Sequence, residues 1–430
     1  MTTLAKSSIT LGEAVERLVP GELSFRFEGY DDSSAGPADA PITVRIVNER
    51  GLSYIMSAPG DLGFARAYVS GDLELDGVHP GDPYDALVHL QNKTRLRAPS
   101  AAETFRVVKA LGLSHLVPPP APPQEHLPRW RRAVEGLRHT KSRDAAAIHH
   151  HYDVSNRFYE LVLGPSMTYT CAVFPKPDST LEEAQFEKYD LVCRKLDLRP
   201  GQRLLDIGCG WGGMVRHAAK HYGVKVIGAT LSEQQAIWAQ QAIAREGLSD
   251  LAEVRFSDYR DVPEGGFDAI SSIGLTEHIG VHNYASYFGF IRDHLKVGGR
   301  MLNHCITRPD NRTRATAGQF IDRYVFPDGE LTGSGRIITE VQDAGLEVQH
   351  EENLRLHYAM TLREWNHNLR DNWDEAVAEV GVATAKVWGL YMAGSRLGFD
   401  RNSIQLHHVL ATKTSPTGQI DFPLRPTWGS

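Results

Sequence analysis

Two ionisable side chains, Glu277 and His278, follow closely on a run of small and apolar residues that begins at Phe267 and continues through "SSIG". Such a run predicts a buried strand, and ligands of an open α/β sheet bind beyond the carboxyl ends of its strands. Glu277 is therefore a candidate for a functional site. The alternative is a carboxylate that only satisfies a neighbouring helix end. We assign His278 no catalytic role and treat it as a structural partner.

The segment "LLDIGCGWGG" is a second candidate for chemistry, because its apolar run ends in a glycine-rich turn. Gly208 and Gly210 let the backbone approach a ligand closely, and the start of the following helix favours a carboxylate. Asp206 either attracts a cationic part of the ligand or orients the turn. The turn is not followed by a second strand with an acidic end, since "VIGATLS" has none, so a plain NAD site is disfavoured. The spacing matches the methionine-binding turn of S-adenosylmethionine-dependent methyltransferases.

Two nearby positions have both a structural and a binding interpretation. Ser232 and Gln235 form an S-x-x-Q capping box, which alone explains both residues as the start of a helix. A binding role for the Gln235 side chain is the alternative to this capping role. Tyr259, in "SDYRD", follows the third predicted strand, where an adenine could stack on its ring or where the ring only packs.

The elements that must position these residues alternate between strand and helix from about residue 201 onward. The predicted strands are "RLLDIGCG", "VKVIGAT", "AEVRFSD", "FDAISSIG" and "GGRMLNHCI". The helices between them are "GMVRHAAKHYG", ended by Gly223, "SEQQAIWAQQAIAREG", opened by Ser232, and "NYASYFGFIRDHL". Such alternation predicts an α/β fold with a doubly wound, mostly parallel sheet.

The N-terminal part of the chain has a different pattern. Strand-like runs, "ITVRIVNE" and "LSYIMSA", and a helix-like stretch around "PYDALVHLQNKT" predict a smaller α+β domain over residues 1–116. The proline-rich segment "VPPPAPPQEHLP", residues 117–128, then marks a spacer and a domain boundary. Directly after it, "RWRRAVEGLRHTKSR" at 129–143 carries six basic residues against Glu135 alone. This segment is either a solvated helix face or a contact for phospholipid headgroups.

Composition narrows the class of protein further. The net charge is −7, with 46 basic and 53 acidic residues, so no global field attracts nucleic acid. Four unpatterned cysteines indicate neither a disulfide framework nor a zinc site, and a reducing cytosol fits them best. The triplet at 149–151 is a poor metal site, because consecutive histidines diverge on a helix or a strand. No signal peptide or membrane span is evident, so we expect a cytoplasmic protein that is at most peripheral to the membrane.

Three longer motifs carry a resemblance to a known family: "HYDVSNRFYELVLGPSMTYTCAVF" at 151–174, "GLTEHIG" at 274–280 and "HYAMTLREW" at 357–365. With the glycine turn, they resemble the cyclopropane-fatty-acyl-phospholipid synthases and their mycolic acid cyclopropane synthase relatives, over about 145–412. The segment "LGFARAYVSGDLELDG" at 62–77 also resembles the N-terminal domain of the full-length phospholipid-acting enzymes. The resemblance implies a Rossmann-like class I methyltransferase domain at 145–415, a lipid-binding-type domain at 1–116, a linker at 117–144 and a tail at 416–430.

The family transfers the methyl group of S-adenosylmethionine to a cis double bond of an acyl chain, and a bound bicarbonate removes a proton from the resulting carbocation. Carried over by motif, the resemblance implies that the bicarbonate ligands are Glu277, Cys171, His304, Ile306 and Tyr358. For the cofactor it points to Tyr169, Thr170, Gly208, Thr230, Leu231, Gln235 and Tyr259, to which Asp206 and Gly210 of the turn are added. It also implies a homodimer. A covalent role for Cys171 is disfavoured, because no adjacent acid–base pair is evident.

One departure from the family concerns the product. Relatives commonly have an aromatic residue directly before the glutamate, where this chain has Thr276. A small polar residue beside the base could change which proton leaves the cation, giving a 10-methylene chain in place of a cyclopropane. That product is the precursor of 10-methyl (tuberculostearic) acid and would require a separate reductase. We rank the cyclopropane slightly ahead.

Two rivals come from other classes of function. One is a small-molecule or mycolate-type methyltransferase that acts on a carrier-bound chain, with the N-terminal domain as a carrier-docking module. The other is a non-catalytic lipid-binding protein on a methyltransferase scaffold. The intact turn together with Glu277, His304 and Tyr358 argues against the second.

Overall fold

A computed structural model describes the fold of the protein over residues 9–19, 21–91, 100–125, 155–313, 318–327 and 329–428. The basic segment at 129–143, the histidines at 149–151 and the first four residues of the 151–174 motif lie outside these residues. The chain divides into two compact units, each built from separate stretches of sequence. The first comprises Met1–Leu127, Gly318–Val325 and Trp365–Leu397, and the second Pro128–Ala317, Phe326–Glu364 and Gly398–Ser430. The domain ranges drawn from sequence, which are continuous, stay a prediction.

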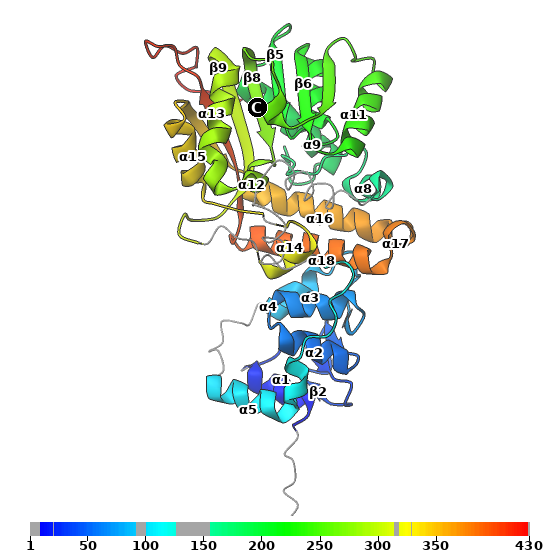
Figure 1. Ribbon diagram of the computed structural model, residues 1–430. Helices are drawn as coiled ribbons and strands as arrows, with labels where there is room; N and C mark the ends of the chain where they lie inside the picture. Colours follow the sequence, from blue (N-terminus) through cyan, green and yellow to red (C-terminus); the bar gives the residue numbers. More distant parts are fainter. Residues whose placement is uncertain are drawn as a thin grey trace, which may run out of the picture. The chain divides into compact units, whose positions relative to one another are not determined.

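The second unit is built on a seven-stranded sheet, which Figure 1 shows in green to red. Its strand order is β10-β11-β9-β8-β5-β6-β7, and all neighbouring pairs from β9 to β7 are parallel. Strand β11 is antiparallel to both of its neighbours. The strands are β5 (Arg203–Ile207), β6 (Lys225–Thr230), β7 (Ala252–Phe256), β8 (Phe267–Ile273), β9 (Leu295–Thr307), β10 (Glu347–Asn353) and β11 (Gln405–Thr412). The predicted doubly wound, mostly parallel sheet is confirmed.

Helices cover both faces of this sheet and bury two separate cores. Leu204 contributes to a core with α9, α10 and α11, whereas Leu205 and Ile207 contribute to a core with α13 and α15, because side chains alternate along a strand. The helices of this unit are α8 (Asn156–Leu163), α9 (Leu181–Leu196), α10 (Gly213–Tyr222), α11 (Glu233–Arg245), α12 (Thr276–Ile279), α13 (Tyr284–His294), α15 (Ser334–Asp343) and the first part of α16 (Arg355–Asp371). Short 3-10 turns are η2 (Tyr259–Asp261) and η3 (Val281–Asn283).

The local signals read from the sequence determine several of these boundaries. Ser232 caps α11, because its side chain accepts a hydrogen bond from the Gln235 amide. Gly223 ends α10 in the left-handed conformation, as a glycine after a helix commonly does. These helix ends fix where the connecting turns begin, and therefore which residues lie at the carboxyl edge of the sheet.

The first unit contains a four-stranded sheet of order β2-β1-β3-β4. Its elements are α1 (Leu11–Leu18), β1 (Arg26–Glu28), β2 (Ser34–Ala35), β3 (Thr43–Ile46), α2 (Glu49–Ser57), α3 (Asp61–Val69), β4 (Leu73–Asp76), α4 (Tyr84–Gln91), α5 (Ala101–Leu111), η1 (Leu113–Leu116), α14 (Gln319–Tyr324), α17 (Trp373–Val380), most of α18 (Val382–Asp400) and the remainder of α16.

The prediction of a strand at "LSYIMSA" was wrong, since these residues belong mainly to α2. The Asn48 side chain caps that helix by accepting from the Gly51 amide, a start signal that outweighs the strand-like composition.

Within the described part of the chain, no helix combines the length and apolar character needed to cross a membrane. The same residues contain no cluster of histidine, cysteine and acidic side chains suited to a metal ion.

Candidate active site

A pocket opens where β5 and β8 end, at the carboxyl edge of the sheet. Six of the predicted cofactor residues line it, together with others that the sequence did not single out. The predicted ones are Tyr169, Thr170, Asp206, Gly208, Gly210 and Gln235. Strands β5 and β8 are neighbours from which the chain continues in opposite directions across the sheet, and such a switch point is where doubly wound sheets bind ligands.

The glycine turn after β5 gives this pocket an open backbone wall. Gly208 has a φ of +73°, and a Cβ on it would lie 3.2 Å from the Leu275 side chain. Gly210 has a φ of +53°, and a Cβ on it would meet no heavy atom within 4 Å. Both conformations favour glycine, and the free space over Gly210 leaves room for a ligand against the main chain. The turn therefore fits the amino-acid part of S-adenosylmethionine.

Asp206 lies at the base of the pocket and is almost fully buried. One carboxylate oxygen accepts a hydrogen bond of 2.6 Å from the Ser271 hydroxyl on β8. Burial raises the pKa of Asp206 to about 7, although the Ser271 bond and the charge of Lys188 both oppose the rise. A cation bound in the pocket would favour the ionised form of this carboxyl.

Lys188, on α9, is a central residue that sequence reasoning missed. Its side chain is fully buried, and its Nζ donates a 2.9 Å hydrogen bond to the Thr170 hydroxyl on the pocket wall. Burial lowers its pKa to about 7, and its charge acts on Asp206, Cys171 and His304. A lysine in an amphipathic helix normally indicates a solvated face, so no sequence signal places Lys188 inside the protein. Trp211 was also missed, although it lines the pocket directly beside the predicted glycines.

The two interpretations of Gln235 apply to different parts of the residue. Its backbone amide caps α11 through Ser232, as the capping box predicts. Its side chain, however, does not return to the Ser232 amide. It lines the pocket and accepts a 2.9 Å hydrogen bond from the Thr230 hydroxyl. Leu231 lies between these residues, directly after β6.

Tyr259 begins η2 and packs edge-on against two rings of α13. The centroid distances are 5.5 Å to Tyr287 and 5.2 Å to Phe290. It is not among the residues that line the pocket, so the geometry gives a clear packing role for this side chain. Contact with an adenine stays a prediction.

Glu277, on the short helix α12, is buried, and only one of its two carboxylate oxygens has a hydrogen-bond partner among the described residues. Its Oε1 accepts a 2.7 Å hydrogen bond from the Ile306 amide on β9. Its Oε2 is also buried and has no hydrogen-bond partner among the residues that the structure describes. Burial raises the pKa of Glu277 to about 7. The bond to Ile306 uses the strand amide to orient the carboxyl group, so Ile306 positions Glu277 here.

His304, two residues earlier on β9, shows a similar arrangement. Its Nδ1 lies 2.9 Å from His408 Nε2, and its backbone carbonyl accepts from Gly274 on the pocket wall. Its Nε2 is buried, with no partner in the described ranges. Burial holds the pKa of His304 well below the ordinary histidine value, so the ring is neutral at physiological pH.

Cys171 and Tyr358 lie together at the start of α16. The Leu354 carbonyl accepts from the Tyr358 amide at 3.2 Å and lies 3.9 Å from the Cys171 sulfur. The Tyr358 ring packs against Phe399, with centroids 4.6 Å apart. Burial raises the pKa of the Cys171 thiol, which disfavours the thiolate and hence a covalent role. The structure thus brings Glu277 into contact with Ile306, and it brings Cys171 and Tyr358 to the same Leu354 carbonyl. The charge of Lys188 acts on Cys171 and His304.

Thr276, the departure from the family pattern, is buried beside Glu277. Its hydroxyl donates a 2.6 Å hydrogen bond to the Asn303 side chain on β9. The neighbouring His278 ring packs against Phe326, with centroids 5.5 Å apart. The hydroxyl of Thr276 is therefore engaged by β9, and its side chain helps to fix α12.

The fold and the pocket define a class I methyltransferase, and comparisons with known proteins identify its family. The family model described as mycolic acid cyclopropane synthetase matches residues 139–409. A probable fatty acid methyltransferase of Mycobacterium tuberculosis is 63% identical over 95% of this chain and 95% of its own length. A probable fatty acid methyltransferase of Pseudomonas putida is 39% identical over 93% of this chain and 95% of its own.

Among solved structures, the cyclopropane synthase MmaA2 of Mycobacterium tuberculosis aligns with a TM-score of 0.59 and 32% identity, covering 64% of this chain and 99% of its own. The mycolic acid cyclopropane synthase CmaA1, complexed with SAH and CTAB, gives a TM-score of 0.59 and 33% identity, covering 63% and 98%. This chain belongs to the mycolic acid cyclopropane synthetase family and is an S-adenosylmethionine-dependent methyltransferase. The resemblance drawn from the motifs is confirmed.

Proposed function

We propose that this enzyme methylates the cis double bond of an unsaturated acyl chain in a phospholipid and gives a cyclopropane fatty acyl chain. S-adenosylmethionine supplies an electrophilic methyl group when it is bound. The observation that carries the proposal is that two buried polar atoms, Glu277 Oε2 and His304 Nε2, have no partner among the described residues, and that the His304 carbonyl bonds Gly274 of the pocket wall. Buried polar atoms usually have partners, so a site with two such atoms points to a small polar ligand.

The chemistry of an alkene explains why such a site suffices. An alkene has no acidic proton and no carbonyl, so its methylation needs no nucleophilic triad. It needs a base near the positive charge that develops. Glu277 and His304 have the groups to hold bicarbonate as that base, with Cys171 and Tyr358 as further predicted contacts. Because the pKa of Glu277 is about 7, its carboxyl can keep a proton and donate it to an anion, which avoids two adjacent negative charges.

The identity of the lipid is supported by relatives that match nearly the whole chain. Both are named fatty acid methyltransferases, whereas a cyclopropane mycolic acid synthase of Mycobacterium bovis matches only 58% of this chain. The long relatives therefore share the N-terminal region, which we propose contacts the lipid. If this region instead docks an acyl carrier, activity would appear with acyl carriers and be missing with phospholipid vesicles.

A 10-methylene product is the second candidate, and Thr276 is the observation that favours it. Its small side chain, bonded to Asn303, replaces the aromatic residue that commonly precedes the glutamate. A hydride shift before proton loss would then give the methylene chain, the precursor of tuberculostearic acid. A separate reductase would have to follow.

One incubation separates these outcomes. Purified enzyme is mixed with S-adenosylmethionine and oleoyl phospholipid vesicles, and the methylated chains are tested for hydrogen uptake under mild catalytic hydrogenation. Resistance indicates a cyclopropane and ready uptake indicates a methylene branch. Glu277→Gln is the matched variant, because glutamine keeps an acceptor for the Ile306 amide. We expect it to bind S-adenosylmethionine but not to turn over, and near-normal turnover would contradict the assignment of the base.

We also propose that the enzyme works in the cytoplasm at the membrane surface and forms a homodimer. The basic segment at 129–143, outside the described residues, is the proposed contact with anionic headgroups. Replacing its arginines should weaken co-sedimentation with anionic vesicles, and unchanged co-sedimentation would exclude this contact.

A further inference from the structure

Methyl transfer from a sulfonium donor to an alkene releases one proton per turnover, whichever product forms. The donor loses its positive charge, the acyl chain gains a methyl group, and a C–H bond then breaks to give the product and a proton. The need for a proton route rests on the proposed function. Glu277 and His304 are both buried, at 7% and 1% exposure, so the proton needs a path from them to bulk solvent.

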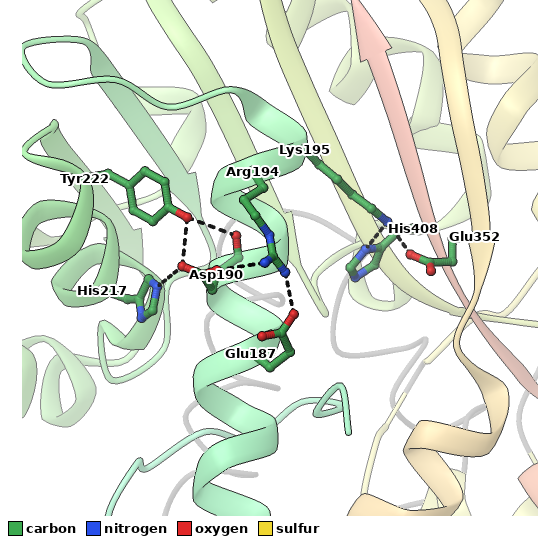
Figure 2. A network of polar contacts seen from close by, with 8 residues as sticks. All are labelled: Glu187, Asp190, Arg194, Lys195, His217, Tyr222, Glu352 and His408. Carbon is green, nitrogen blue, oxygen red and sulfur yellow. Dashed lines mark hydrogen bonds and ion pairs between the residues drawn. The ribbon is translucent and has the colours of Figure 1, made fainter. Parts of the chain in front are cut away.

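A continuous line of polar contacts leads away from His304. His304 Nδ1 lies 2.9 Å from His408 Nε2, and His408 Nδ1 lies 3.0 Å from Lys195 Nζ. Lys195 Nζ in turn donates a 2.5 Å bond to Glu352 Oε2. Figure 2 shows Lys195, from α9, reaching both His408 and Glu352.

Only the Glu352 end of this line of contacts is exposed to solvent. His304 is 1% exposed and His408 and Lys195 are 0% exposed, whereas the Glu352 side chain is 35% exposed. An ion pair between Lys195 and Glu352 would be complete without the two imidazoles. Their presence extends the line to His304 Nε2, which has no partner elsewhere in the described chain.

We propose that His304, His408, Lys195 and Glu352 form a relay that carries the released proton from the catalytic site to solvent. His304 Nε2 takes up the proton, and its Nδ1–H passes one to His408 Nε2. The Lys195 ammonium gives a proton to Glu352, which exchanges it with water, and the amine that forms then takes the proton of His408 Nδ1–H. Each transfer breaks one bond to hydrogen and forms another, so no other reactant is needed.

Burial favours the neutral forms of the two imidazoles. Burial lowers the pKa of His304, His408 and Lys195. The charge of Lys195 lowers the pKa of His408 further, followed by the charges of His304, Lys188 and His350. Against this, the carboxylates of Glu352 and Glu351 raise the pKa of Lys195. Glu352 is the acceptor at the solvent end, because its side chain bonds Lys195 and is 35% exposed.

The neighbouring residue of β11 offers a matched control. His407 is equally well buried, at 3%, and also bonds a carboxylate, with its Nε2 3.0 Å from Glu351. Its Nδ1 lies 2.7 Å from the Thr307 hydroxyl. Because side chains alternate along a strand, His407 and His408 point to opposite faces, and His407 has no part in the relay.

The test measures product and proton separately in one tube. Enzyme, S-adenosylmethionine and oleoyl phospholipid vesicles react for a single turnover in weak buffer with a pH-indicator dye, while samples are quenched for product. His408→Gln keeps a polar side chain but cannot relay a proton. We expect proton release to lag behind product formation by about tenfold or more, with recovery on adding imidazole as a mobile base. His407→Gln should release protons at the wild-type rate.

Other results would overturn the relay. Proton release that keeps pace with product in His408→Gln would do so, as would equal slowing of both without rescue by imidazole, which indicates a structural role. If His408→Gln does not fold, Lys195→Arg carries the test, because a guanidinium keeps its charge but does not give up a proton. Absence of methylated product in the wild-type enzyme would overturn the proposed function, and the relay with it.

Discussion

Replacing Glu277 with glutamine isolates the free energy linked to one buried carboxyl group. The folded protein holds the proton of Glu277 more tightly than the unfolded chain does, because burial raises the pKa from 4.5 to about 7. Below pH 4.5 the group is neutral in both states and costs nothing. As pH rises from there through 7, the unfolded chain ionises first, and the folded state loses stability relative to it.

The size of this loss follows from the pKa difference. Each unit corresponds to about 1.4 kcal/mol, so the full effect is about 3 kcal/mol, most of it developed between pH 5 and pH 8. Glutamine does not ionise in this range, and its carbonyl can still accept the Ile306 amide. We therefore expect the stability of Glu277→Gln relative to wild type to rise by about 2 to 3 kcal/mol from pH 5 to pH 8.

The assay is urea unfolding at pH 5, 6, 7 and 8, followed by tryptophan fluorescence. Comparing the two proteins at each pH cancels the contributions of all other titrating groups that do not couple to Glu277. The absolute offset is uninformative, because the amide of glutamine has its own unpaired donor. Only the change with pH is diagnostic, and parallel curves for the two proteins would refute a raised pKa at this position.

Two further substitutions test the packing around the site. Gly208→Ala should destabilise the protein by about 2 kcal/mol and weaken S-adenosylmethionine binding in calorimetry. Gly201 is the control, because it also has a positive φ, of +84°, but a Cβ on it would meet open space. Gly201→Ala should cost about 1 kcal/mol and leave binding intact. Equal effects of the two would show that the contact with Leu275 is unimportant. Thr276→Val should cost about 1 to 3 kcal/mol in thermal unfolding by leaving Asn303 without its donor, and Thr276→Ser should be milder because it keeps the hydroxyl. A valine variant as stable as wild type would contradict this bond.

The sheet and the glycine turn were predictable because their signals are local. The strand at Arg203–Ile207, its turn and the cap at Ser232 each depend on residues adjacent in sequence. The error at "LSYIMSA" also has a local cause. Its composition favoured a strand, but the Asn48 side chain caps a helix that begins just before it.

Only the site residues that lie within sequence motifs could be predicted; the contacts between them could not. Glu277 was a candidate from its place after a strand, but the Ile306 amide that holds it comes from another strand, 29 positions away. Lys188 looked like a surface residue of a helix, and only the fold buries it against Thr170. The histidine pair of β9 and β11 depends on antiparallel pairing over 104 positions, which no local pattern reveals.

Three buried groups of this site, Glu277, Asp206 and Lys188, have pKa values of about 7, each shifted mainly by burial. A group with its pKa near the working pH changes protonation state at little free-energy cost. The charge of the site can therefore follow the reaction, which begins with a cationic donor and ends with a neutral product and a proton. A cationic ligand favours ionised Asp206 and neutral Lys188, and its conversion to a neutral product removes that preference. Burial therefore has two effects. It disfavours the charged forms of these groups, and it brings their pKa values into the range where a bound ligand can change their protonation state.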